Sequence, residues 1–251
     1  MPGNLRARFP LHEWTAVTTG KSGSSVWRLD GPSRLYAKHG ADVAREADRL
    51  QWFAHHGIPV PEVVDLGADW LATTALPGRP AHELWRAADR IRVVDAIADL
   101  TKQLHALPVD DCPFDATLAV TVPAALANAR AGRVDLNDLD SDRAGWSTAQ
   151  LVVALRTAVR PDEDLVVGHG DLCLPNVLID PNTLRATGFV DVGRAGRADR
   201  YNDLAIITRS LGMDGRNSQF GPRAADRFLE RYGAPRDDER FAFYRLLDEF
   251  F

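Results

Sequence analysis

Two aspartates in the second half of the chain constrain its structure more than any other feature. Asp171 precedes Asn176 in the segment HGDLCLPN, and Asp191 follows in VDVG. The residues between them alternate around a Pro-Asn turn and predict a hairpin over 177–179 and 186–190. That hairpin would bring Asp191 back beside Asn176. Two carboxylates and an amide gathered in this way suit a reaction that needs a base and a bound Mg²⁺.

The chemistry that this pattern indicates is phosphoryl transfer. The reaction needs magnesium to neutralise phosphate charge and a carboxylate to orient the attacking hydroxyl. We predict that Asp171 is this catalytic carboxylate and that Asn176 and Asp191 are the Mg²⁺ ligands. Either aspartate alone could be an ordinary turn residue. The combined layout supports the functional interpretation, because it matches the catalytic and metal-binding loops of protein kinases.

A lysine and a glutamate near the start of the chain supply a second part of the same site. Lys38 ends a predicted strand, and Glu46 lies on the helix predicted over 43–56. In kinases a strand lysine contacts the nucleotide phosphates and is held by a helix glutamate, so we predict an ion pair between these two. The Gly/Ser-rich turn at 20–25 is a candidate phosphate-covering loop. It does not end a Walker A loop, because Thr15 stands where that motif needs glycine.

Periodicity divides the chain into a strand-rich first part and a helical remainder. Alternation predicts strands at 14–19, 26–29, 35–38, 60–64 and 71–76. After a Pro-Gly-Arg-Pro break, helical spacing recurs at 91–107, 123–130, 148–159, 201–211, 222–232 and 239–250. The acidic stretch at 132–147 is expected to be an exposed loop. We therefore predict an α+β protein with an antiparallel β-sheet lobe over 1–76 and a mainly helical lobe over 77–251.

Composition excludes several classes of partner. The net charge is −5 and the pI about 5.8, with no basic block, so we expect no nucleic-acid partner. The sequence has no apolar run long enough to span a membrane and no apolar leader, so we expect no membrane association and a cytoplasmic location. Cys112 and Cys173 lack metal-like spacing and are expected to be reduced thiols.

Two further polar residues near the aspartates are expected to be structural. His169 could be a base or a metal ligand, but a histidine before a Gly-Asp turn more often bonds to backbone and holds the loop. Asp203, in RYNDL, is expected to accept backbone amides from the loop that carries Asp171.

With these residues in view, the chain resembles the aminoglycoside phosphotransferases of the 3′ type, the kanamycin and neomycin kinases. The similarity is strongest in VVGHGDLCLPNVLIDPNTLRATGFVDVGRAGRADRYNDLAI and FAFYRLLDEFF, and it extends to EADRLQWFAHHGIPVPEVV and HALPVDDCPF. The resemblance implies a eukaryotic-protein-kinase-like fold of two lobes, with ATP and Mg²⁺ bound in the cleft. It implies the same roles that the residues themselves indicate for Lys38, Glu46, Asp171, Asn176 and Asp191.

The same resemblance implies contacts to the nucleotide. It assigns Ser22 to the nucleotide-positioning loop, and Thr74 and Leu76 to a hinge whose backbone groups bind adenine. Tyr36 is implied as a stacking platform for the base.

For the antibiotic, the resemblance implies an acidic receptor at the C-terminal end of the chain. It assigns Asp248, Glu249 and the carboxylate of Phe251 to this role, together with Arg194 as a basic residue that contacts substrate. Aminoglycosides carry several ammonium groups, so such a site fits them electrostatically. The resemblance also places a group of further acids in the loop region that helps to close the site: Asp135, Asp138, Asp140 and Asp142.

We therefore expect ATP-dependent phosphorylation of the 3′-hydroxyl of kanamycin- and neomycin-like antibiotics, giving resistance, by a monomer or weak dimer. The run Cys173-Leu174-Pro175 is also similar to the streptomycin 3″-kinases, which keeps 3″ phosphorylation as an alternative. A kinase of another small hydroxylated metabolite is a second alternative. A catalytically silent kinase-like binding module is the third alternative. The complete set of kinase residues argues against it, because a binding module does not need all of them: Lys38, Glu46, Asp171, Asn176 and Asp191.

Overall fold

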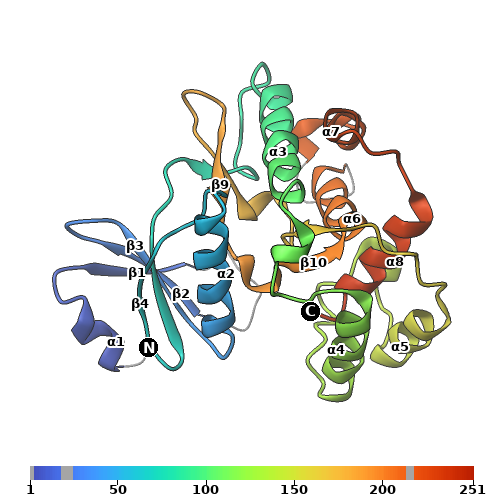
Figure 1. Cartoon of the computed structure of the whole chain (residues 1–251), viewed down its shortest axis with the longest axis horizontal. Coiled ribbons are helices and arrows are strands. Elements are labelled where there is room, and N and C mark those ends of the chain that lie inside the picture. The colour runs from blue at the N-terminus through green and yellow to red at the C-terminus, as the bar shows by residue number, and fades with distance from the viewer. Residues whose placement is uncertain (1–2, 18–24, 213–217) are drawn as a thin grey trace.

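The computed structural model describes residues 3–17, 25–212 and 218–251. Within these ranges, the first part of the chain is an antiparallel sheet with the strand order β1-β2-β3-β5-β4 (Figure 1). A short helix, α1 (Gly3–Arg8), precedes the sheet. Its strands are β1 (Glu13–Val17), β2 (Ser25–Asp30), β3 (Leu35–His39), β4 (Val63–Leu66) and β5 (Trp70–Thr74).

Strand β3 serves both faces of this sheet, because successive side chains on a strand point to opposite sides. Leu35 and Ala37 are buried in a small apolar cluster that includes Leu5 of α1. Lys38 points to the other face, where it meets Glu46 of helix α2 (Val43–His55). Figure 1 shows α2 between the sheet and the helical part of the molecule. Strand β3 thus places Lys38 at the boundary between the sheet and the helical part of the molecule.

Helix α2 buries two charged side chains along with its apolar ones. Its buried residues are Val43, Glu46, Ala47, Arg49, Leu50 and Phe53. A buried charge costs free energy unless it is hydrogen-bonded or paired. Glu46 and Arg49 therefore call for an explanation other than packing.

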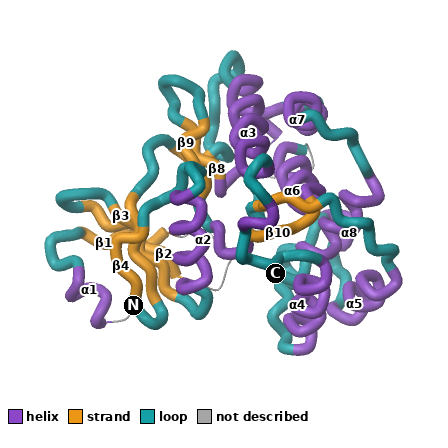
Figure 2. The backbone as a smooth tube through the Cα atoms, viewed as in Figure 1, coloured by secondary structure: helices purple, strands orange, loops and turns teal. Residues whose placement is uncertain are grey.

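The remainder of the chain is mainly helical (Figure 2). The helices are α3 (Arg90–His105), α4 (Leu118–Arg130), α5 (Thr148–Thr157), α6 (Arg200–Leu211), α7 (Ala224–Tyr232) and α8 (Asp238–Asp248). Short 3₁₀ turns occur at Val109–Asp111, Ser141–Arg143, Leu174–Asn176, Val192–Arg194 and Ser218–Phe220.

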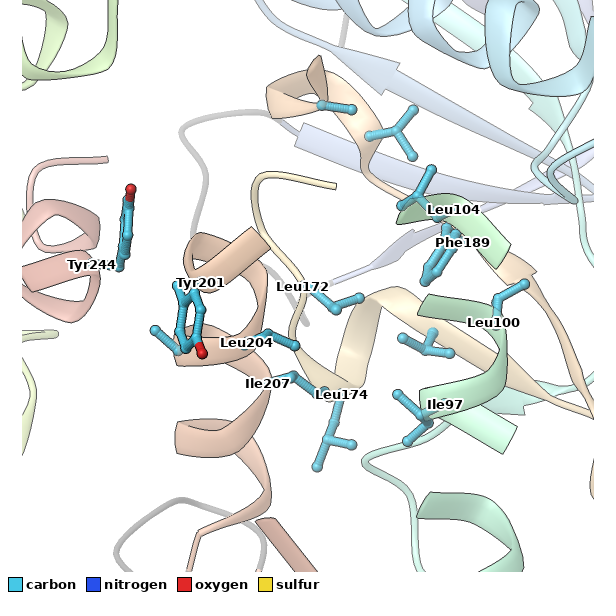
Figure 3. Packing of buried hydrophobic residues seen from close by; sticks show 14 of the residues in the cluster. Ile97, Leu100, Leu104, Leu172, Leu174, Phe189, Tyr201, Leu204, Ile207 and Tyr244 are labelled. Atoms are coloured by element: carbon cyan, nitrogen blue, oxygen red, sulfur yellow. The ribbon is translucent and has the colours of Figure 1, made fainter. Parts of the chain in front are cut away.

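One apolar core holds these helices and the aspartate loop together. Figure 3 shows Ile97 and Leu104 of α3, with Leu204 and Ile207 of α6, in the cluster that also contains Leu172 and Leu174. All of these side chains are fully buried. The leucines on either side of Cys173 therefore anchor the loop that carries Asp171.

Short strands position the two ends of the segment that carries Asp171 and Asp191. Strand β8 (Val177–Ile179) pairs with β6 (Arg79–Pro80) and with β9 (Ala186–Phe189). Strands β7 (Leu165–Gly168) and β10 (Gly196–Asp199) are antiparallel, with Gly168 opposite Gly196. The loop after β7 and the loop before β10 therefore lie side by side.

The structure confirms the predicted helices and the hairpin, and it corrects several boundaries. The strand expected at 60–64 begins at Val63, since Pro59 and Pro61 have no N–H to donate to a ladder. Helix α4 begins at Leu118 and not at Pro123. Strands β6 and β10 had no counterpart in the prediction. The last two residues of the strand expected at 14–19 lie outside the described residues.

In the part of the chain that the structure describes, no helix is both long and apolar enough to cross a membrane.

Candidate active site

Asp171 lies in a turn shortly after β7, and the side chain of Asn176 is hydrogen-bonded to it. The Asn176 Nδ2 donates to the backbone oxygen of Asp171 at 2.9 Å and to its Oδ2 at 3.1 Å. Burial raises the pKa of Asp171 and nearby Asp248 adds to the rise, while Arg194 opposes it. The predicted catalytic carboxylate and the predicted Mg²⁺ ligand Asn176 are thus in direct contact.

A buried carboxylate holds the backbone of this turn. Asp203 of α6 accepts hydrogen bonds from the amides of His169 at 2.6 Å and Gly170 at 2.9 Å. Its Oδ2 also lies 3.0 Å from Nε2 of His105 on α3. Burial opposes ionisation, but the bonds from His105 and His169 hold the pKa of Asp203 below its usual value. The expectation that Asp203 accepts amides from the loop is confirmed.

The His169 ring connects the two aspartate loops. Its Nδ1 accepts from the amide of Asp171 at 3.2 Å, so the proton is on Nε2, which donates to the carbonyl of Val190 at 3.1 Å. His169 has no measurable exposure to solvent. The ring therefore holds the loop by bonding to backbone, as expected from the sequence.

Lys38 bridges two carboxylates on the other side of the site. Its Nζ lies 2.7 Å from Oε2 of Glu46 and 2.7 Å from Oδ1 of Asp191. Burial alone would lower the pKa of Lys38, but the two carboxylates raise it, so the ammonium is kept charged. Burial opposes ionisation of Asp191 as well, yet Lys38 keeps the pKa of that carboxyl below its usual value. The predicted ion pair is present, and it extends to the predicted metal ligand.

Asp191 adopts a backbone conformation that places its side chain for this contact. Its φ of 57° and ψ of 50° are left-handed, which is uncommon outside glycine and more tolerable for aspartate than for most residues. A tight 3₁₀ turn, Val192–Arg194, follows directly. The chain therefore reverses immediately after the carboxylate and returns toward Asp171.

Gly170 is where that returning segment meets the aspartate turn. Its φ is +82°, and a Cβ at this position would overlap the carbonyl oxygen of Arg194. Only glycine fits both the conformation and the space. Arg194 is thereby held beside Asp171 by backbone contact.

The C-terminal end of the chain closes the site from a third side. Arg194 Nη2 lies 3.0 Å from Oδ1 of Asp248, and its Cζ lies 4.7 Å from the centre of the Phe251 ring. Arg209 of α6 reaches the other oxygen of Asp248 at 2.6 Å and both carboxylate oxygens of Asp140 at 3.2 Å. Burial opposes ionisation, but Arg194 and Arg209 hold the pKa of Asp248 below its usual value.

Comparison with known proteins identifies the family. The model of the phosphotransferase enzyme family (APH) matches residues 13–244, and an aminoglycoside 3′-phosphotransferase from Streptomyces fradiae is 50% identical over 98% of both chains. The chain belongs to the aminoglycoside phosphotransferase family.

Two solved structures of this family show the same fold. A type VIII aminoglycoside 3′-phosphotransferase is 47% identical, with a TM-score of 0.92 over 99% of this chain and 97% of that one. The aminoglycoside phosphotransferase APH(3″)-Id from Streptomyces rimosus, solved with ADP and streptomycin, is 33% identical, with a TM-score of 0.81 over 98% and 95% of the two chains. The kinase-like two-lobed α+β fold expected from the sequence is confirmed.

The expected adenine-side residues of this aminoglycoside phosphotransferase lie together at one end of the sheet. Tyr36 of β3 is paired with Thr73 of β5, and Thr74 ends that strand. Leu76 follows and lies against Gly188 of β9, where a Cβ would be 2.8 Å from its Cδ1. This end of the sheet therefore lies next to the hairpin that leads to Asp191. Ser22, expected in the nucleotide-positioning loop, lies outside the described residues.

Glu249, like Asp248, already has hydrogen-bond partners within the protein. Its carboxylate accepts from the amide of Asp140 at 3.1 Å and from Nη1 of Arg143 at 3.1 Å. The side chain is only 4% exposed, and burial raises its pKa. In this structure Glu249 fastens the turn at Ser141–Arg143 to the end of α8.

Sequence reasoning missed Arg143 and Arg209, and it left Asp140 as one of several unassigned acids. Together with Arg194, Asp248 and Glu249 they form a chain of alternating charges. The only available signal was the acidic character of the loop, and no periodicity marks its arginine partners. These contacts depend on tertiary folding of α6 and α8 onto that loop.

Proposed function

We propose that this protein transfers the γ-phosphoryl group of ATP to the 3′-hydroxyl of aminoglycoside antibiotics of the kanamycin and neomycin class. The observation that carries the proposal is the position of Lys38, which joins Glu46 to Asp191 while Asn176 holds Asp171. An ATP kinase needs these groups together, and a binding module does not. The 50% identity to the enzyme of Streptomyces fradiae supports the choice of substrate.

In this proposal Asp171 orients the acceptor hydroxyl and takes its proton as the new bond forms. The contact from Asn176 fixes the rotation of the carboxylate, and Asp203 fixes the backbone beneath it. Positioning of this kind is the main protein contribution to phosphoryl transfer, since the transition state requires little covalent chemistry. Lys38 supplies positive charge for the phosphates.

Asn176 and Asp191 have the donor set that a magnesium ion needs. Both offer oxygen ligands, the type that Mg²⁺ prefers. The contact of Asn176 to Asp171 uses the nitrogen end of its amide, and the Asp191 side chain is 41% exposed although Lys38 holds one of its oxygens. The residues therefore fit the ion. When bound, it would neutralise charge on the phosphates.

For the nucleotide, we propose that adenine lies beside Tyr36, Thr74 and Leu76, at one end of the paired strands β3 and β5. The lobe boundary then falls after residue 76. The ADP complex of the Streptomyces rimosus relative supports ATP as the donor.

For the acceptor, we propose that the drug lies against Asp248, Glu249, Phe251 and Arg194, beside Asp171. Ammonium groups suit a carboxylate-rich site. A phosphate on the drug adds negative charge and weakens its attraction to RNA, which would give resistance. We further propose that the protein acts in the cytoplasm as a monomer or weak dimer.

Phosphorylation of streptomycin at the 3″-hydroxyl is the second candidate. It is favoured by the shared fold of the relative solved with streptomycin, although the sequence identity there is 33%. The two candidates differ in the acceptor hydroxyl, so they are separable directly.

The test uses purified protein, Mg-ATP and three acceptors: kanamycin, a 3′-deoxy aminoglycoside and streptomycin. We expect mass spectrometry to show one added phosphoryl group on kanamycin alone, with NMR locating it at the 3′ oxygen. Product with streptomycin only would replace the first candidate by the second. Asp171→Ala should abolish turnover while ATP-analogue binding by calorimetry is kept.

A further inference from the structure

Arg49 is a buried cation whose contacts are unusual. Its side chain lies on the inner face of α2, and the residue is only 7% exposed. Nε donates to the carbonyl of Ala195 at 2.6 Å, and Nη1 donates to the carbonyl of Arg45 at 3.0 Å. The guanidinium carbon lies 4.4 Å from the centre of the Phe114 ring. Among the described residues, its hydrogen-bond partners are carbonyl groups and none is a carboxylate.

This arrangement is a costly way to fill space. Desolvation of a guanidinium is offset poorly by neutral carbonyls, and an apolar side chain of similar volume often serves stability as well or better. Burial accordingly lowers the pKa of Arg49, with the like charge of Arg45 adding to the effect. Its position is better explained by what the guanidinium holds in place.

The guanidinium holds the segment that leads from Asp191 to β10. Ala195 directly follows Arg194, and the carbonyl of Phe114 accepts from the amide of Arg197 at 2.8 Å. The space is tight, because a Cβ on Gly196 would lie 2.8 Å from the Phe114 oxygen. Arg49 therefore contacts both the segment and the residue against which the segment packs.

The same helix contacts this segment at its other end as well. Glu46, one turn before Arg49, holds Lys38, which holds Asp191 at 2.7 Å. Gly193 lies between the two contacts, where a Cβ would be 3.7 Å from Cβ of Glu46. One face of α2 thus determines where the metal-side end and the Arg194 end of the segment lie.

We propose that Arg49 is a positioning residue for the antibiotic side of the site. Its hydrogen bond to the Ala195 carbonyl fixes the position of Arg194, and Arg194 in turn fixes the carboxylate of Asp248. The antibiotic side of the site is thereby aligned with the nucleotide side. The inference rests on the proposed function, because it assigns the Arg194 side to the drug. It is distinct from that function, since a kinase could bind its acceptor without this link.

The test compares Arg49→Met with Arg45→Met on the same helix. Arg45 is a matched control, because its side chain is 57% exposed and, among the described residues, its ion pair with Asp42 spans 3.8 Å. We expect Arg49→Met to raise KM for kanamycin about tenfold, a size in keeping with displacement of a binding group by a fraction of an ångström. KM for ATP should stay within about twofold, and Arg45→Met should match the unchanged protein in both constants.

A merely structural role predicts a different pattern. Lower stability reduces the fraction of active enzyme and so lowers apparent kcat, but it does not raise KM for one substrate alone. An unchanged KM for kanamycin, or an equal rise in both KM values, would overturn the proposal. Loss of kanamycin turnover in the unchanged protein would instead remove the proposed function itself.

Two milder variants cover the case in which Arg49→Met does not fold. Arg49→Lys keeps the charge with a single donor group, and Phe114→Leu removes the ring beneath the guanidinium. Each should raise KM for kanamycin about threefold and leave KM for ATP unchanged. Failure of both soluble variants to shift the kanamycin constant would contradict the positioning role.

Discussion

Replacement of Asp203 by asparagine tests whether a buried carboxylate supports the catalytic turn. The substitution keeps the size and shape of the side chain but replaces one oxygen by an NH₂ group. In the native protein Oδ2 receives the His169 amide and His105 Nε2, while Oδ1 receives the Gly170 amide. In either orientation of the new amide, at least one of these donors faces an N–H group.

The cost follows from the bonds that are lost. A hydrogen bond to a charged group contributes about 1.5–3 kcal/mol, and a buried donor left without a partner costs about 1–3 kcal/mol. We take about 3 kcal/mol as the central value for Asp203→Asn. For a chain of this size each kcal/mol lowers Tm by about 2–4 °C, so the expected drop is about 6–12 °C.

The assay combines thermal unfolding with steady-state kinetics at pH 7. Asp99→Asn is the control, since Asp99 also binds nitrogen donors at 2.7 and 2.8 Å but lies on the surface with a side chain 50% exposed. It should change Tm by less than about 2 °C. We expect Asp203→Asn to lower kcat as well, because the Asp171 backbone loses its support. A Tm change no larger than that of the control would refute the reasoning.

Three further predictions concern charges in the site. Lys38→Met should lower kcat/KM for ATP by about a hundredfold or more in steady-state assays, since no other described cation bridges the two carboxylates; a loss below tenfold would contradict its role. Because burial raises the pKa of Asp171, the acid limb of kcat against pH should lie above about pH 4, the range of an ordinary aspartate, and a limb below it would argue against this base. Arg209→Met should lower the free energy of unfolding measured by urea denaturation, and the whole of this decrease should be present at pH 7. Burial opposes ionisation of Asp248, but Arg194 and Arg209 lower its pKa in the folded state, so their contribution to stability is present above the unfolded-state pKa of about 3.9 and is lost as pH falls through the folded-state pKa. The loss of stability caused by Arg209→Met should therefore become smaller below about pH 4. A loss that does not change with pH would contradict this account.

The sequence was informative wherever function depends on short-range spacing. Asp171 and Asn176 are close along the chain, and the hairpin after them has clear alternation and a Pro-Asn turn. Lys38 and Glu46 are likewise separated only by a tight connection. Local patterns were therefore enough to anticipate these contacts and the antiparallel sheet behind Lys38.

The sequence was silent where a contact depends on tertiary folding. Strand β10 reads Gly-Arg-Ala-Asp and has no alternation, so its pairing with β7 depends on the neighbouring strand. Helix α4 starts early because Glu163, distant in sequence, accepts the Leu118 amide at 2.9 Å. Arg209, which contacts Asp248, and Arg143, which contacts Glu249, could not be predicted for the same reason.

Gly170 carries a consequence for the mutational tolerance of the protein. It has no functional group, yet the aspartate turn and the segment of Arg194 touch backbone to backbone at this point. Even the smallest side chain would push the two backbones apart, and Asp171 would then move away from Arg194. In a library of single substitutions selected for drug survival, this glycine should therefore be as intolerant of replacement as the aspartate beside it.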